Sequence, residues 1–426
     1  MNFVAAVVSL FHDANAKGVQ AFSPGLPAKR ATLGWLSGCV ATLKGLRRIH
    51  HKAGTTPSGL LACLIRLPRV GAARQPWAEG WNAFGVQFAI GMLLLAGLSQ
   101  TAFGFDQPFV FTITADSHLD DHTDREFYQR TLKRAAADKP AFHIDLGDTF
   151  MSEKHTNRAD AAQQYVDQQR YFALLGVPVH LVIGNHDGEC GRYLDGTTSN
   201  LAVWSRSMRM KYFPEPLAPD GRNYYAWETN NALFIALDPF WFSPRARRND
   251  DNWFRTLGKE QYDWLKRTLE TSQAKFKCVF IHHLVGGADR QGRGGVEVVP
   301  LYEWGGKNAD GTEGFAAHRP GWAMPIHQLL VTNHVNAVFH GHDHLYVKQE
   351  LDGIVYQEVP QPGDPQGSTR SAAEYGYKNG VMLGSSGYLR VTFSTERTEV
   401  EYVRATGRGA YAVADRYTMI ASIGFR

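Results

Sequence analysis

Five apolar runs in this chain each end in a short motif of Asp, Asn or His, and no other feature constrains the fold as strongly. Short apolar runs bounded by turn residues are typical of buried strands. Ligands of open α/β sheets bind at the carboxyl ends of strands, so we expect the motifs to meet at one site. The runs cover residues 109–115, 141–146, 177–183, 277–281 and 335–339. The motifs that follow them are Asp116-Ser117-His118, Gly147-Asp148, Gly184-Asn185-His186-Asp187, His282-His283 and Gly341-His342-Asp343-His344.

The spacing within these motifs allows pairs of side chains to reach the same ion. Successive side chains of a strand point to opposite faces, so residues two apart project together. Asp116 and His118 form one such pair, and His342 and His344 form a second. A glycine precedes Asp148, which lets the backbone bend toward a metal. Nitrogen and oxygen ligands without thiolate suit Mn, Fe, Co or Zn rather than Ca or Mg.

The order of the motifs resembles the calcineurin-like metallophosphoesterase superfamily, over roughly residues 108–404. That family runs Asp-x-His, Gly-Asp, Gly-Asn-His-Asp or -Glu, a His near a strand end, and Gly-His-x-His. The resemblance implies an α/β fold, a four-layer α/β/β/α sandwich of two mixed β-sheets flanked by helices. It also implies a dinuclear site for two divalent or trivalent ions of Mn, Fe, Zn or Co. The implied ligands are Asp116, His118, Asp148 and His344 for one ion and Asp148, Asn185, His282 and His342 for the other.

The same resemblance implies a mechanism of phosphate ester hydrolysis. A hydroxide that bridges the two ions would attack phosphorus, while His186 would act as general acid, oriented by Asp187. Purple acid phosphatases, distant relatives, have an iron-binding tyrosine at the position of Met151, so a tyrosinate bond is not expected here. Adjacent strand residues face opposite ways. One of His282 and His283 is therefore the expected ligand, and the family spacing favours His282.

The ligand set predicts an exported metal-dependent phosphoesterase that acts on a small-molecule phosphate ester, with monoesters favoured. A phosphodiesterase, including one for cyclic nucleotides, shares this metal core and is the alternative. A non-catalytic metal-binding scaffold of the same fold is less expected. Such relatives typically lose ligands, whereas this chain keeps all seven together with His186. No motif indicates the oligomeric state.

The amino-terminal part differs from the rest in charge. Residues 1–104 contain ten Lys and Arg against Asp13 and Glu79, whereas the remaining residues have a small acidic excess. The positive net charge therefore belongs to the tail and indicates no specific nucleic-acid surface. We expect residues 1–80 to be a poorly structured basic tail or an over-extended reading of the gene start.

An apolar run of eleven residues, 88–98, precedes the small-residue pattern Ala102-x-Gly104. Such a run is short for a membrane-spanning helix and typical of a signal-peptide core. Residues 81–104 are therefore expected to be a signal peptide, and an uncleaved membrane anchor is the alternative. The catalytic domain would then comprise residues 105–426, begin near Phe105, and lie in the periplasm or be secreted.

The remainder of the body alternates between helix and strand patterns. Expected helices cover 123–137, opened by a capping box at Thr123 and Glu126, 161–174, and a stretch around Tyr262, Leu265 and Leu269. Expected hairpins turn at Asn230-Asn231 and Asp352-Gly353, and late strands cover 381–394 and 399–404. Cys190 and Cys278 are expected to be unpaired, although an exported protein could join them in a disulfide.

A long segment rich in Gly and Arg, residues 285–325, joins two of the ligand-bearing strands. Loops at such places usually shape the substrate pocket, and glycines would permit a mobile cover. A solvated surface insertion is the alternative. The candidate contacts for the phosphate and its organic group are Arg290, Arg293, Trp304 and Arg319.

Overall fold

A computed structural model describes residues 108–420, except for 121, 198, 215–220, 242–251, 288, 290, 395 and 407–408. The chain divides into two units, Met1–Gly97 and Leu98–Arg426, and the described residues belong to the second. The predicted tail, signal segment and cleavage point therefore lie outside the described residues. Within the described ranges, each helix is too short or too polar to cross a bilayer.

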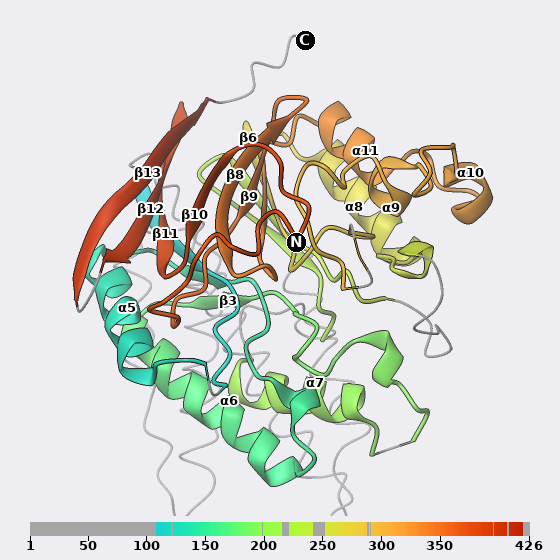
Figure 1. Ribbon diagram of the computed structural model, residues 1–426. Coiled ribbons are helices and arrows are strands. Elements are labelled where there is room, and N and C mark those ends of the chain that lie inside the picture. Colours follow the sequence, from blue (N-terminus) through green and yellow to red (C-terminus); the bar gives the residue numbers. More distant parts are fainter. Residues whose placement is uncertain are drawn as a thin grey trace, which may run out of the picture. The chain divides into compact units, whose positions relative to one another are not determined.

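Two mixed β-sheets form the centre of the second unit (Figure 1). The first sheet has the order β13 (Ala410–Ile420), β12 (Arg397–Thr406), β11 (Gly387–Phe393), β1 (Phe109–Thr114), β2 (His143–Asp145) and β3 (Val179–Leu181). The second has the order β10 (Val381–Gly384), β8 (Leu345–Leu351), β9 (Ile354–Glu358), β7 (Ala337–His340), β6 (Phe276–Phe280), β5 (Ala232–Ala236) and β4 (Tyr225–Thr229).

Helices cover the outer face of each sheet. On the first sheet these are α5 (Arg125–Ala137), α6 (Arg158–Phe172) and α7 (Leu201–Tyr212). On the second they are α8 (Lys259–Thr271), α9 (Tyr302–Gly305) and α11 (Ile326–Thr332), with the short α10 (Phe315–His318) farther out. The predicted four-layer sandwich is confirmed.

The strand periodicity explains why the two sheets stack. In β1, Phe111 and Ile113 face the apolar layer between the sheets, where they join Phe234 and Phe339 of the second sheet. The alternate residue Thr112 points away and contacts His143 across the ladder at 2.8 Å. In the first sheet β1, β2 and β3 pair in parallel, and in the second sheet β5, β6, β7 and β9 do so. Within each group the carboxyl ends of the strands therefore lie side by side. The five predicted motifs follow strands of these two parallel groups.

Most predicted elements are present, with three differences. Both hairpins are confirmed, and Asn230, Asn231 and Asp352 take the positive φ that such turns require. The helix α5 is capped one residue later than expected: Asp124 accepts from the N–H of Phe127 at 2.9 Å. The run 381–394 is broken into β10 and β11, which belong to different sheets. The edge strand β13 was not predicted, because its exposed residues lack an apolar alternation.

The two cysteines of the described residues are unpaired, as expected. Cys190 and Cys278 are both buried as free thiols. Burial raises the pKa of the Cys278 thiol to about 12, so this group stays neutral. Both cysteines belong to the apolar packing, in different clusters.

Candidate metal centre

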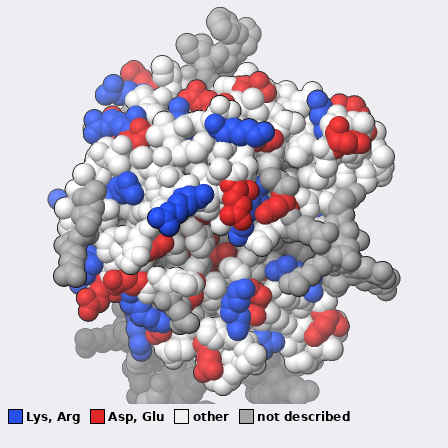
Figure 2. All heavy atoms as spheres, in the orientation of Figure 1, with Lys and Arg blue, Asp and Glu red and all other residues white. Residues whose placement is uncertain are grey.

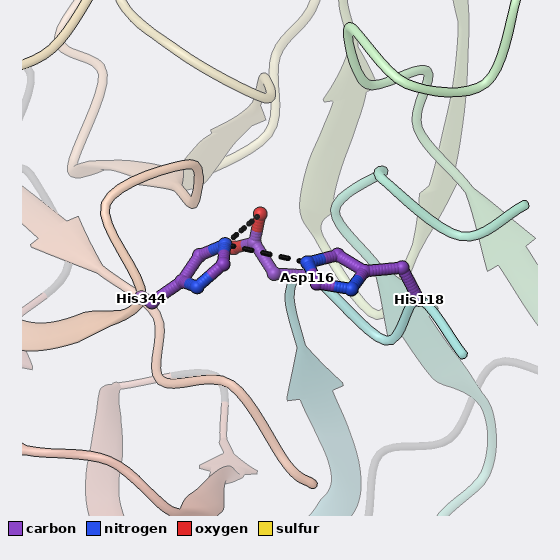
Figure 3. Close-up of side chains that lie close together, drawn as sticks. All are labelled: Asp116, His118 and His344. Carbon is purple, nitrogen blue, oxygen red and sulfur yellow. Dashed lines mark hydrogen bonds and ion pairs between the residues drawn. The ribbon is translucent and has the colours of Figure 1, made fainter. Parts of the chain in front are cut away.

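Three side chains from opposite sheets form the first ligand cluster. Figure 3 shows Asp116, from the end of β1, between the imidazoles of His118 and His344. The Nε2 atom of His344 lies 3.4 Å from Asp116 Oδ1 and 3.4 Å from His118 Nε2. All three potential ligand atoms lie within 4.8 Å of one another.

A second cluster contains Asp148, His282 and His342. The Nε2 atom of His282 lies 3.3 Å from Asp148 Oδ2 and 3.2 Å from His342 Nδ1. The amide oxygen of Asn185 approaches the same Nε2 atom at 3.1 Å, so a neutral oxygen joins the cluster. The structure thus brings all seven predicted ligand residues into two clusters.

The two clusters adjoin through the backbone. The N–H of His342 donates to Asp116 Oδ2 at 2.9 Å, so a residue of the second cluster binds a residue of the first. The N–H of Asp116 donates to Gly147 O at 3.0 Å, which ties the first motif to the loop of Asp148. The N–H of Gly341 donates to His282 O at 2.9 Å and joins the ends of β7 and β6 within the second sheet.

Four of the ligand residues have a left-handed backbone, which residues with a side chain rarely adopt. The φ angles are 55° for Asp116, 53° for Asp148, 82° for His342 and 56° for His344. Such conformations persist where surrounding structure imposes them, and they concentrate at functional sites. At three of the five motifs, the backbone therefore leaves the extended conformation at the ligand residues themselves.

Two glycines allow the second and third motifs to approach each other. A Cβ on Gly184 would lie 2.0 Å from the backbone N of Asp148. A Cβ on Gly147, whose φ is 97°, would lie 2.4 Å from the backbone N of Gly184. Any side chain at either position would force the loops apart, so this contact explains both glycines of the motifs.

Three imidazoles are anchored at the ring nitrogen that faces away from the clusters. His282 Nδ1 donates to Leu146 O at 2.9 Å. His342 Nε2 donates to Gln291 O at 3.0 Å, and His118 Nδ1 lies 3.1 Å from a carboxylate oxygen of Asp120. Such anchors fix the ring tautomer and leave the other nitrogen free for a metal.

The charge distribution of the clusters fits bound cations. Asp116 Oδ1 is buried and has no hydrogen-bond donor in the described part of the chain. Burial would lower the pKa of His282, but Asp148 outweighs it and raises that pKa to about 10. Burial likewise opposes ionisation of Asp148, yet His282 and His186 hold its pKa well below the usual range. These buried carboxylates are therefore stable as anions only beside positive charge, which metal ions would provide.

His186 lies at the edge of the second cluster. The backbone N–H of His186 donates to Asp148 Oδ1 at 2.7 Å, and the ring atom Nε2 lies 3.8 Å from Asp148 Oδ2. The side chain of His186 is 23% exposed and that of His344 is 41% exposed. The centre is therefore open to solvent on the side of these two rings.

Glu153, which the sequence did not indicate, is the carboxylate that contacts the His186 ring. It bonds His186 Nδ1, and its own N–H donates to His186 O at 3.2 Å. Tyr193 donates its hydroxyl hydrogen to the second carboxylate oxygen at 2.9 Å. Burial raises the pKa of Glu153, but the hydrogen bond and the charge of His186, together with Tyr193 and Lys154, outweigh it and lower the pKa to about 2. The carboxylate is therefore ionised.

The expectation that Asp187 orients the His186 ring is wrong. The Asp187 carboxylate accepts from four backbone N–H groups instead. Their donors are Gly184 (2.7 Å), Asp148 (3.1 Å), Thr149 (2.8 Å) and Phe150 (2.8 Å). Asp187 thus joins the loop of Asp148 to its own loop and shapes the backbone around the second cluster.

His283 lies outside both clusters. Its Nε2 atom faces Arg255 Nη1 at 3.4 Å, and its Nδ1 atom faces Leu284 O at 3.0 Å. The neighbouring His282 lies in the second cluster, as the family spacing favoured.

The segment 285–325 differs from the expected mobile cover. Trp304 is fully buried and donates its indole N–H to Tyr356 Oη at 3.1 Å. Arg319 binds buried Glu303, and also donates to Trp253 O at 2.6 Å and Arg255 O at 3.0 Å. These two residues hold the segment onto the second sheet, so the expectation that they contact substrate is wrong.

Of the two remaining candidate arginines of the segment, Arg293 lies beside a residue of the last motif. Arg293 lies beside Asp343, with Nε 3.8 Å from Oδ1, and over the ring of Tyr375 at 4.0 Å from its centroid. It is close to the metal centre, since Asp343 separates the ligands His342 and His344. Arg290 lies outside the described residues.

Comparison with solved structures finds proteins of similar fold. The solved structure of PhoD is 16% identical, with a TM-score of 0.51, over 75% of this chain and 71% of that one. A purple acid phosphatase from yellow lupin (Lupinus luteus) is 14% identical, with a TM-score of 0.49, over 73% of this chain. A dimetal phosphatase from Danio rerio is 15% identical, with a TM-score of 0.47, over 74% of this chain and 100% of that one.

This chain covers only 53% of the lupin enzyme, or about half its length. A search among curated proteins by sequence finds no match. The family model for calcineurin-like phosphoesterases matches residues 109–346, which is more than half of the chain and contains all five motifs. The chain therefore belongs to the calcineurin-like phosphoesterase family.

Proposed function

We propose that the protein is a metal-dependent phosphomonoesterase for a small-molecule phosphate ester. The observation that carries the proposal is the meeting of seven nitrogen and oxygen ligands in two adjoining clusters, with His186 at the open edge. Ions such as Mn, Fe, Co or Zn suit these ligands. When bound, they would supply Lewis-acid activation of water and neutralise the charge of the phosphate.

The protein's own residues would hold the ions and fix the orientation of the imidazole ligands. Asp148 is the proposed shared ligand of both ions: its Oδ2 atom faces His282, and its Oδ1 atom accepts from the backbone N–H of His186. Asn185 contributes an oxygen without adding negative charge, which keeps the second cluster attractive to an anionic substrate. Asp120 and the carbonyls of Leu146 and Gln291 hold the imidazoles so that they need not reorient during turnover.

His186 is the proposed general acid, with Glu153 as its support. Glu153 accepts from Nδ1, so Nε2 is the atom that can give a proton to the leaving oxygen. The carboxylate also stabilises the ring while it is positively charged. Because Tyr193 binds the other carboxylate oxygen, Glu153 cannot readily turn away from the ring.

The face of the described residues that Figure 2 shows favours a small-molecule substrate over a nucleic acid. On the face shown in Figure 2, Lys and Arg are interspersed with Asp and Glu rather than gathered in one broad basic area. Nucleic-acid binding depends on an extended basic surface that contacts many phosphates. The metal clusters and Arg293 are therefore the proposed source of phosphate binding.

Metal analysis combined with a substrate panel tests the proposal. We expect two equivalents of transition metal per chain, and faster hydrolysis of phosphomonoesters than of diesters or cyclic nucleotides. A preference for diesters would favour the phosphodiesterase alternative. Failure to hydrolyse any ester after loading with Mn, Fe, Co or Zn would identify a metal-binding scaffold and overturn the proposal.

We also propose that the enzyme is exported. The support is the apolar run 88–98 followed by Ala102 and Gly104, which matches the core and small-residue end of a signal peptide. Expression of the full chain in a bacterial host, followed by amino-terminal sequencing, should give a mature start near Phe105. A mature chain that retains residues 88–98 would favour a membrane anchor instead.

A further inference from the structure

The turn at residues 341–344 supplies one ligand to each metal cluster. His342 belongs to the second cluster and His344 to the first. Both residues have a positive φ, 82° and 56°, so the turn holds two uncommon backbone conformations within three residues. Such a turn relaxes unless other groups hold it in place. The residue between the two ligands is Asp343.

Asp343 is buried beneath the turn, where it binds two separate segments. Its Oδ2 atom accepts from the hydroxyl of Tyr377 at 2.8 Å and from the N–H of Gly294 at 3.0 Å. Its Oδ1 atom faces Arg293 Nε at 3.8 Å. The N–H of Asp343 donates to Glu358 Oε1 at 3.0 Å, at the end of β9.

The groups around Asp343 are themselves fixed. Glu358 Oε2 contacts His340 Nδ1 at 2.6 Å, which ties the end of β9 to the end of β7. Gly294 has φ 112°, and a Cβ there would lie 2.9 Å from Val298 Cγ1. A glycine is thus required for the backbone to reach Asp343. The side chains of Asp343, Glu358 and Tyr377 are all buried.

We propose that Asp343 is a positioning residue for both metal sites, and that Tyr377 and the backbone at Gly294 act through it. The inference rests on the proposed dinuclear site. It also connects the segment 285–325 to the metals, because the neighbours of Asp343 include Arg293 and Gly294 of that segment. A change at this carboxylate should therefore weaken both metals together. Asp120 supports His118 alone, so a change there should weaken the first metal only.

The variant Tyr377→Phe tests this by removing one hydroxyl. Tyr388→Phe is the matched control, since Tyr388 is also buried and donates to a carboxylate, Asp138 Oδ2, at 2.5 Å, on the helix-covered face of the first sheet. Co²⁺ would be titrated into metal-free full-length protein against a competing chelator, with the ligand-field absorption followed at each site. We expect Tyr377→Phe to raise both dissociation constants about tenfold, the low end for loss of a partner of a metal ligand. Tyr388→Phe should leave both unchanged.

Asp343→Asn provides a second measurement with a larger expected effect on the same two constants. Thermal unfolding of the metal-free proteins shows whether either variant is merely less stable; Tyr377→Phe and Tyr388→Phe should lose similar stability. Wild-type constants in both Tyr377→Phe and Asp343→Asn, or a change confined to one site, would overturn the inference. Wild-type protein that binds fewer than two ions would instead contradict the proposed function.

Discussion

The metal centre and the segment 285–325 contain similar kinds of residues, but the fold uses them in opposite ways. In the centre, potential ligand atoms face one another across short gaps, and Asp116 Oδ1 has no hydrogen-bond donor among the described residues. In the segment, Trp304 and Arg319 direct their polar atoms to Tyr356, Glu303 and backbone carbonyls.

This difference separates a binding site from a structural contact. Buried polar groups are nearly always hydrogen-bonded, so a carboxylate oxygen such as Asp116 Oδ1, which is buried without a donor among the described residues, indicates a site for a cation. An arginine that already binds a buried carboxylate and two carbonyls has few donors left for substrate. Whether a residue's polar atoms already have hydrogen-bond partners is therefore stronger evidence about its function than its position in a long loop near a site.

The largest expected effect is that of Asp148→Asn. This change removes the carboxylate that is proposed to bind both ions, so both metals should be lost and hydrolysis should fall below detection. Metal analysis and steady-state kinetics would measure this, with the exposed Asp160→Asn on α6 as the control. If Asp148→Asn retained both metals, the centre would not depend on a shared carboxylate.

The variant His186→Asn should slow the turnover of esters with poor leaving groups by about 10²–10⁴-fold, the usual scale for a lost general acid. Both metals should remain, and the loss should shrink for activated aryl phosphates, which need no proton. The exposed His334→Asn is the matched control. Loss of metal from His186→Asn would place this residue among the ligands instead.

In the segment, Trp304→Ala should destabilise the protein by about 3–5 kcal/mol, the cost of truncating a buried aromatic side chain. The value of kcat/KM per folded molecule should change little. Chemical denaturation together with kinetics on the same samples would separate the two effects. Trp241→Ala, at a site that is 51% exposed, should cost far less stability. A raised KM with unchanged stability would restore Trp304 as a substrate contact.

The smallest expected effect is that of Glu153→Gln, at about tenfold on kcat for poor leaving groups, in the range for a lost partner of a functional histidine. The amide keeps the shape but weakens the hold on His186 Nδ1. In the double variant with His186→Asn, the second change should add little, because both act through the same ring. Exposed Glu313→Gln serves as control. Fully additive losses would show that Glu153 acts independently.

The metal ligands could be predicted from sequence because each follows a strand and local geometry decides where it points. The alternation of a strand grouped Asp116 with His118. In the structure β1 ends at Thr114, so the turn after it, where Asp116 has a positive φ, directs these side chains. The hairpins at Asn230 and Asp352 are local in the same sense, since two residues determine the turn. The four-layer arrangement came from the resemblance to a family.

The supporting contacts could not be predicted, because they join residues far apart in the chain. Glu153 reaches His186 across 33 positions, and Tyr377 reaches Asp343 across 34. No local pattern distinguishes these residues from other Glu or Tyr residues in loops. Asp187 was misassigned for the same reason. Its place in the motif predicted a contact with the His186 ring, whereas in the fold its carboxylate accepts from four backbone N–H groups.

The sequence by itself thus determined which atoms can bind metal, since the residue types and their place after apolar runs are local properties. Only the tertiary structure decided which groups hold those atoms and whether a nearby polar residue faces substrate or the core. The physical reason is that a buried polar group binds whatever partner the folded chain brings within hydrogen-bond distance. For Trp304 that partner is the hydroxyl of Tyr356, 52 positions along the chain.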